Sequence, residues 1–262
     1  MAIGRNTPAA AADTTPLLQW ANGIPVGRLG VGRFGPLVGF HSEIGRDAQF
    51  DAVMIAAGVA RATIKHKRNG GVAEVQHWYF GEKLTLYPIT SGPPFTTIGG
   101  LVARAAATVD AGLGVRWSPG ERSNLAVRCV LALPGAGDEL PEPVIVQLAT
   151  KSRATDMLLA ALITHVDHCE AADDLVDRAK HPDSVTCHEL ALTLAAGSEQ
   201  EWGKGDTATV VPFVVVSIAP TTRAEFQAHW CGKEIHALAL ASWAGIVAWA
   251  GDYATEREAS YA

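Results

Sequence analysis

Apolar and polar residues alternate most clearly between Val59 and Phe80, where two strand-like runs flank Asn69-Gly70. Asn and Gly tolerate the positive φ angles of a two-residue type I′ turn, so this segment is predicted to be a β-hairpin. The predicted cross-strand pairs are Arg68 with Gly71, Lys67 with Val72, Lys65 with Glu74, Thr63 with Gln76, Arg61 with Trp78, and Val59 with Phe80. A three-residue turn that includes Gly71 would shift this register and exchange the two faces.

The two faces of this hairpin differ in polarity. The more apolar face is expected to pack on the core, and it carries Ala60, Ala62, Ile64, Val75 and Tyr79 with His66 and His77. The opposite face, with Arg61 over Trp78 and Lys65 beside Glu74, is expected to be solvated.

Further strands and helices follow the hairpin. Alternation predicts a strand over Lys83 to Thr90, which Pro88 ends or confines to a sheet edge. The remaining predicted strands are Asn124 to Leu133, Pro143 to Thr150, Val185 to Leu194, and Thr207 to Ile218, of which the last is so apolar that it should be central. Helical spacing predicts a helix over 152–180, and Thr222-x-x-Glu225 is a capping box that opens a helical C-terminus.

This order of elements defines an α+β protein with a mostly antiparallel sheet, one inserted helix and a helical C-terminal tail. It is compatible with a partly closed, OB-like barrel and also with other barrels and sandwiches. We expect a flexible lead-in at 1–24, a β-rich domain at 25–220 that contains the helix at 152–180, and a helical segment at 221–262 packed on it.

Composition places the chain among globular proteins, since 48% of its 262 residues are apolar and 18% are charged. The four cysteines are far apart and form no C-x-x-C motif, which is typical of a reducing cytoplasm. The N-terminus lacks the apolar core of a secretory signal. The longest apolar run, Ile235 to Gly251, has Trp243 and Trp249 inside it, which favours a core helix over a membrane span. We therefore expect a cytoplasmic protein with no membrane partner.

Charge supplies the main functional signal. The chain has a net charge of −6, yet the first run of the hairpin carries four cations and no carboxylate. A basic ribbon on an acidic protein indicates an anionic partner. An aromatic ring beside a cation is the pair with which proteins bind single-stranded nucleic acid, so we predict a non-catalytic protein of that kind. The predicted contacts are Arg61, Lys65, Lys67, Arg68, Trp78 and Phe80 in the hairpin, with Lys151, Arg153, Trp202 and Lys204 extending the groove. An ordinary hairpin with a solvated charged face would have the same pattern.

An enzyme is the first alternative. His41 and the carboxylates Glu43, Asp47 and Asp51 form a cluster with helical spacing, such as a metal-dependent enzyme acting on nucleotides or nucleic acid would need. The His41-Ser42-Glu43 run is not followed by P-C-x-x-C, which excludes a zinc deaminase. The glycines of 30–35 match a dinucleotide fingerprint in letters, but no strand precedes them and no helix follows. We therefore lean against an enzyme and expect no catalytic residues and no cofactor.

A second group of residues could ligate zinc: His165, His168, Cys169, His181, Cys187 and His188. Their spacing matches no standard zinc module, so we expect no metal site. The remaining alternative is an assembly protein that forms homo-oligomers through its C-terminal helices. The small residues of that tail, such as Ala241 and Gly245, would let helices approach closely, and Trp230, Trp243 and Trp249 could anchor a partner.

Three segments carry a family resemblance: Val144 to Val166, the hairpin, and the run GSEQEWGKGDTATVVPFV at 197–214. Together they resemble phage and prophage-type accessory proteins that bind single-stranded DNA. The resemblance implies an OB-like sheet without catalytic residues. The chain ends in TEREASYA, whereas bacterial single-strand binding proteins end in a Gly-rich tail with an acidic tip, so a standard replication role is not expected.

Overall fold

A computed structural model describes the greater part of the chain. The described residues are 14–21, 39–68, 71–91, 95–98, 101–104, 109–110, 114–115, 122–133, 142–151, 153–179, 181, 183–195, 201–202, 209–210 and 214–259. No helix among them is long and apolar enough to cross a membrane.

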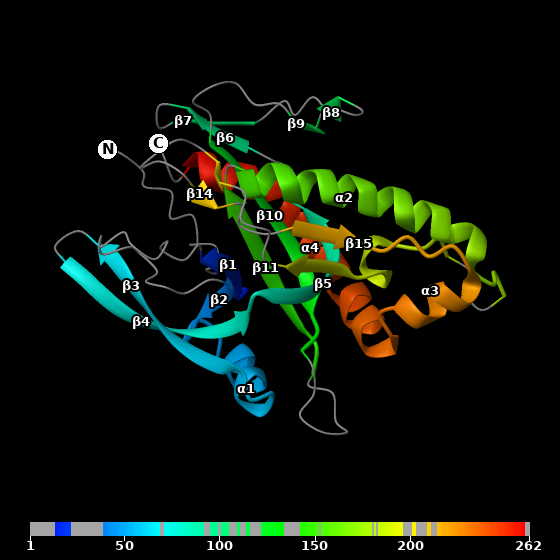
Figure 1. The fold of residues 1–262 in the computed structure, drawn as a ribbon, viewed down its shortest axis with the longest axis horizontal. Coiled ribbons are helices and arrows are strands. Elements are labelled where there is room, and N and C mark those ends of the chain that lie inside the picture. The colour runs from blue at the N-terminus through cyan, green and yellow to red at the C-terminus, as the bar shows by residue number, and fades with distance from the viewer. Residues whose placement is uncertain are drawn as a thin grey trace, which may run out of the picture.

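A mostly antiparallel sheet forms the centre of the fold (Figure 1). Its main path, in sheet order, is β15 (Val214–Ser217), β12 (Leu192–Ala195), β5 (Lys83–Ser91), β10 (Arg122–Leu131), β11 (Val144–Lys151), β1 (Leu17–Ala21), β2 (Gly39–Glu43), β4 (Gly71–Gly81) and β3 (Ala60–Arg68). Among these strands β1 and β11 are the parallel neighbours. Shorter strands are β6 (Phe95–Ile98), which pairs with β10 and with β7 (Leu101–Arg104), and the pairs β8 (Val109–Asp110) with β9 (Gly114–Val115) and β13 (Glu201–Trp202) with β14 (Thr209–Val210).

The predicted α+β class and mostly antiparallel sheet are confirmed, but the sheet does not close into a barrel. Its path runs from one edge at β15 to the other at β3. Two further expectations were wrong. The apolar strand expected at the centre, β15, lies at an edge, and β1, which falls within the predicted lead-in of 1–24, is an inner strand between β11 and β2.

Two long helices cover opposite faces of the sheet, as alternation along β10 shows. Leu125, Val127, Cys129 and Leu131 join the cluster that contains Leu158 of α2 (Arg153–Ala172). Val130 instead joins Ile235 and Ile246 of α4 (Lys233–Ala259). Because neighbouring strand residues point to opposite faces, the sheet lies between α2 and α4.

Shorter helices complete the fold. The helix α1 (Ala48–Ala56) packs Phe50 and Met54 into the same cluster as Trp78 of β4. The 3₁₀ turns η1 (Asp173–Leu175) and η2 (Cys187–Glu189) follow α2. The helix α3 (Arg223–His229) is capped by Thr222, whose side chain accepts from the Glu225 backbone N–H as the sequence predicted.

Candidate functional site

The hairpin has the register predicted from its sequence. Lys65 pairs with Glu74, Arg61 with Trp78, and Arg68 with Gly71, so two residues remain for the turn. Those residues, Asn69 and Gly70, lie outside the described residues, so the predicted type I′ turn stays a prediction.

The part of this hairpin nearest its turn consists of β3 and β4 alone, as far as the described residues show. The neighbouring strand β2 pairs with β4 from His77 onward, and β3 is the last strand of the sheet. Residues 63–68 and 71–76 therefore form a two-stranded arm, and Figure 1 shows it reaching away from the long helices. The arm carries three cations, Lys65, Lys67 and Arg68, against one carboxylate, Glu74, which gives it a net charge of 3 − 1 = +2 on a chain of −6.

The base of the hairpin is not a stacking surface. Only 1% of Trp78 is exposed, and its indole N–H donates to Asp51 Oδ1 on α1 over 2.6 Å. The guanidinium of Arg61 lies 4.9 Å from the Trp78 ring centroid, which confirms the predicted pair but covers the ring further. Phe80 is half-buried, and its ring centroid lies 6.5 Å from that of Phe50 on α1. The expectation that Trp78 is solvated and stacks on bases was wrong, because α1 packs on it. The rest of this face is exposed as predicted at Arg61, Thr63, Glu74 and Gln76.

The structure does not bring Lys151 or Arg153 to the arm. Lys151 ends β11 and Arg153 begins α2, and three strands separate β11 from β3 in the sheet. Trp202 belongs to the separate pair β13 and β14, and Lys204 lies outside the described residues.

The acidic cluster proposed for an enzyme has structural partners instead. Glu43 accepts from the Arg46 guanidinium at 3.0 Å, and Asp47 caps α1 by accepting from Phe50 N at 2.8 Å. Asp51 binds both Trp78 and the backbone N–H of Gly45. His41 is buried, with its Nδ1 3.1 Å from Nδ1 of His77. Each carboxylate thus holds the α1 region in place, which does not favour a catalytic metal there.

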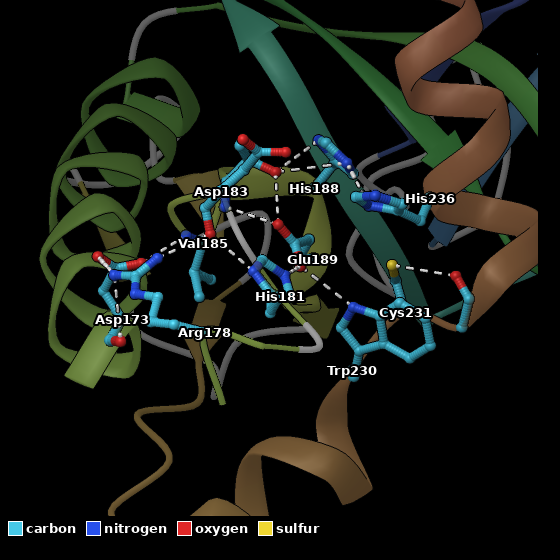
Figure 2. A network of polar contacts seen from close by, with 12 residues as sticks. Asp173, Arg178, His181, Asp183, Val185, His188, Glu189, Trp230, Cys231 and His236 are labelled. Carbon is cyan, nitrogen blue, oxygen red and sulfur yellow. Dashed lines mark hydrogen bonds and ion pairs between the residues drawn. The ribbon is translucent and has the colours of Figure 1, made fainter. Parts of the chain in front are cut away.

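The predicted zinc ligands divide into two groups. His165 and His168 both contact the hydroxyl of Ser217, at 2.7 and 2.9 Å, and His165 also contacts the Cys187 carbonyl at 2.9 Å. A hydrogen bond from Cys169 is the main reason why the pKa of the Cys187 thiol lies below its ordinary value. The others, His181 and His188, lie beside Glu189, and Figure 2 shows them together with Trp230 and with His236 of α4.

Glu189 is the centre of the second group. Only 1% of it is exposed, and its carboxylate accepts four hydrogen bonds. The donors are Thr186 N at 2.9 Å, Thr186 Oγ at 3.0 Å, His181 Nε2 at 2.5 Å and Trp230 Nε1 at 3.2 Å. Burial raises the pKa of Glu189, but the hydrogen bonds from Thr186 and His181 outweigh burial, so its pKa lies below the ordinary value. The carboxylate is therefore charged at neutral pH.

Two histidines lie next to Glu189. Nε2 of the fully buried His188 is 3.0 Å from Nδ1 of His236 on α4 (Figure 2). Burial and the neighbouring His236 lower the pKa of His188 to about 4, so its ring is neutral. Sequence reasoning missed Glu189 and His236. Thr186-x-x-Glu189 is a capping box, and that motif could have identified the buried carboxylate.

Comparison of the chain with protein-family models, with curated proteins and with solved structures found no match. The resemblance to phage-type proteins thus stays a prediction.

Proposed function

We propose that this protein binds single-stranded nucleic acid by contacting its phosphates with the arm. The observation that carries the proposal is the net charge of +2 on a narrow two-stranded element at the edge of the sheet, in a chain of −6. Phosphate contacts by Lys and Arg supply most of the affinity of sequence-independent binding.

The burial of Trp78 changes the mode of binding from the one expected from the sequence. Base stacking on the hairpin would need an exposed ring, whereas Trp78 is held between Asp51 and Arg61. Contacts to the backbone therefore dominate, and the arm should discriminate little between bases. A single strand suits an acidic protein better than a duplex does, because a duplex concentrates more negative charge near the rest of the chain.

Fluorescence anisotropy with a labelled oligonucleotide, as a single strand and as the matching duplex, tests the proposal. The parent should bind the single strand more tightly, and its affinity should fall as salt rises. The double variant Lys65→Gln/Lys67→Gln should lower the slope of log K against log salt by about 1.4, since each phosphate contact contributes ~0.7 on a single strand.

The matched control is Lys83→Gln/Lys233→Gln, which removes the same charge from exposed positions on β5 and at the start of α4. This control should keep the slope of the parent. Equal losses in both double variants would mean that net charge, not the arm, determines binding. A parent that binds neither oligonucleotide at low salt would refute the proposal.

A further inference from the structure

We propose that His188, His236 and Glu189 form a binding site for a divalent transition-metal ion. One ligand atom of each residue lies within 4.8 Å of the others, and the site joins η2 to the first turn of α4. It is independent of the arm, which lies at the β3 edge of the sheet.

The hydrogen bonds around His188 leave one ring nitrogen as an acceptor, which an ion can bind in place of the contact with His236. Thr186 Oγ donates its single proton to Glu189, so it can only accept from His188. It lies 3.1 Å from Nδ1 of His188 and 3.3 Å from Nε2, and we assign the ring proton to Nδ1, the nearer atom, because Nε2 also faces His236. The lone pair of Nε2 therefore points toward His236. This is the usual state of a metal-binding histidine, whose second ring nitrogen donates to a neighbouring group.

His236 can supply the second nitrogen. Without an ion, its Nδ1–H donates to Nε2 of His188 across the 3.0 Å between them. Binding of an ion moves that proton to Nε2 of His236, which is possible because this ring is partly exposed to solvent. Two nitrogens 3.0 Å apart can both bond one ion at about 2.0–2.1 Å.

Glu189 supplies the charge that a divalent ion needs. Its carboxylate oxygens already accept four hydrogen bonds, which is about their capacity. The bond from Trp230, at 3.2 Å the longest of the four, is the one that the ion would replace. His181 and Thr186 would stay bound and orient the carboxylate. Since ligands at about 2.0–2.2 Å from an ion cannot lie more than ~4.4 Å apart, binding must draw the three residues slightly together.

The ligand chemistry selects the class of ion. Two imidazoles with one carboxylate suit Zn²⁺, Fe²⁺, Co²⁺ or Ni²⁺, while Mg²⁺ and Ca²⁺ prefer oxygen ligands. Three protein ligands leave at least one coordination position of such an ion for water or another small ligand.

The test uses the full chain, stripped with a chelator and titrated with Zn²⁺ by calorimetry and with Co²⁺ by absorption. We expect one ion per chain, a higher melting temperature with Zn²⁺, and a cobalt spectrum without a thiolate charge-transfer band. His236→Gln should weaken binding at least tenfold, because it removes one ligand from the partly exposed side of the site. His229→Gln, which removes a histidine from α3, should bind like the parent.

Three outcomes would overturn the proposal. The first is a folded parent that takes up neither ion. The second is a cobalt spectrum with a thiolate band, which would assign the metal to the cysteines. The third is a His236→Gln variant with the affinity of the parent. The cobalt spectrum is recorded on the parent, so the site can be tested even if the variant does not fold. Nucleic-acid binding and its salt dependence should be the same with and without the ion.

Discussion

Replacing Trp78 should destabilise the protein, because its side chain is buried and joins the hairpin to α1. Trp78→Ala removes a large ring that is 1% exposed, and large-to-small changes of this kind cost about 3–5 kcal/mol. Trp78→Phe keeps most of the packing but loses the indole N–H that donates to Asp51 over 2.6 Å. A hydrogen bond to a charged group contributes about 1.5–3 kcal/mol.

The lower half of that range applies to Trp78→Phe. Asp51 is only half-buried and keeps its second hydrogen bond, from Gly45 N at 2.8 Å, so water can replace part of the lost contact. Phe also loses a little packing because its ring is smaller than that of Trp. We therefore expect Trp78→Phe to lower the free energy of unfolding by about 2 kcal/mol and Trp78→Ala by about 4 kcal/mol.

Urea unfolding followed by circular dichroism gives both values from the midpoint and the slope of the transition. Trp243 is a matched control, because 42% of it is exposed on α4. Trp243→Phe should change the stability by less than about 0.5 kcal/mol. If the free energy of unfolding of Trp78→Ala is within about 1 kcal/mol of that of the parent, the Trp78 ring is not buried, and the solvated position predicted from the sequence is correct.

Two further predictions concern other parts of the chain. Gly39 has a φ of 134°, and a Cβ at this position would lie 2.4 Å from the Gly81 carbonyl oxygen. Gly45 also has a positive φ, of 87°, but a Cβ there would meet nothing within 4 Å. Gly39→Ala should therefore destabilise the protein by about 2 kcal/mol more than Gly45→Ala in the same urea assay, and equal losses would contradict the close approach. Burial raises the pKa of the Cys129 thiol, while the hydrogen bond from Cys169 lowers that of Cys187. In a thiol-labelling time course read by peptide mapping near neutral pH, Cys187 should react well before Cys129, and labelling of Cys129 first in the folded protein would refute this.

The hairpin shows which parts of the fold the sequence determines locally. Its register could be predicted because Asn69-Gly70 restricts the turn and thereby the pairs. The face that carries Ile64 and His77 is buried as predicted. The burial of Trp78 on the opposite face could not be predicted, because α1 covers Trp78 and the apolar residues of Ala48–Ala56 follow no single helical face. The segment Leu17–Ala21 is likewise too short to show a pattern, and its place between β11 and β2 depends on strands far away in the sequence.

The histidine cluster was missed for a related reason. His188 and His236 are 48 positions apart, and a bridge between Leu190 and Trp230 brings their segments together. Sequence spacing identifies metal sites only when the ligands share one turn or helix. Here the residues that share a segment with His188, such as Cys187, point to other partners.

The two proposals can be separated because their residues stand on different parts of the sheet. The arm extends from the β3 edge, and its base is fixed by Asp51, Trp78 and Arg61. The histidine cluster lies where η2 packs against β5 and α4, with five strands between β5 and β3 in the sheet. Charge changes in the arm should therefore alter salt-dependent binding at constant stability. Loss of Trp78 should lower the stability first, and it should affect binding only through the orientation of the arm.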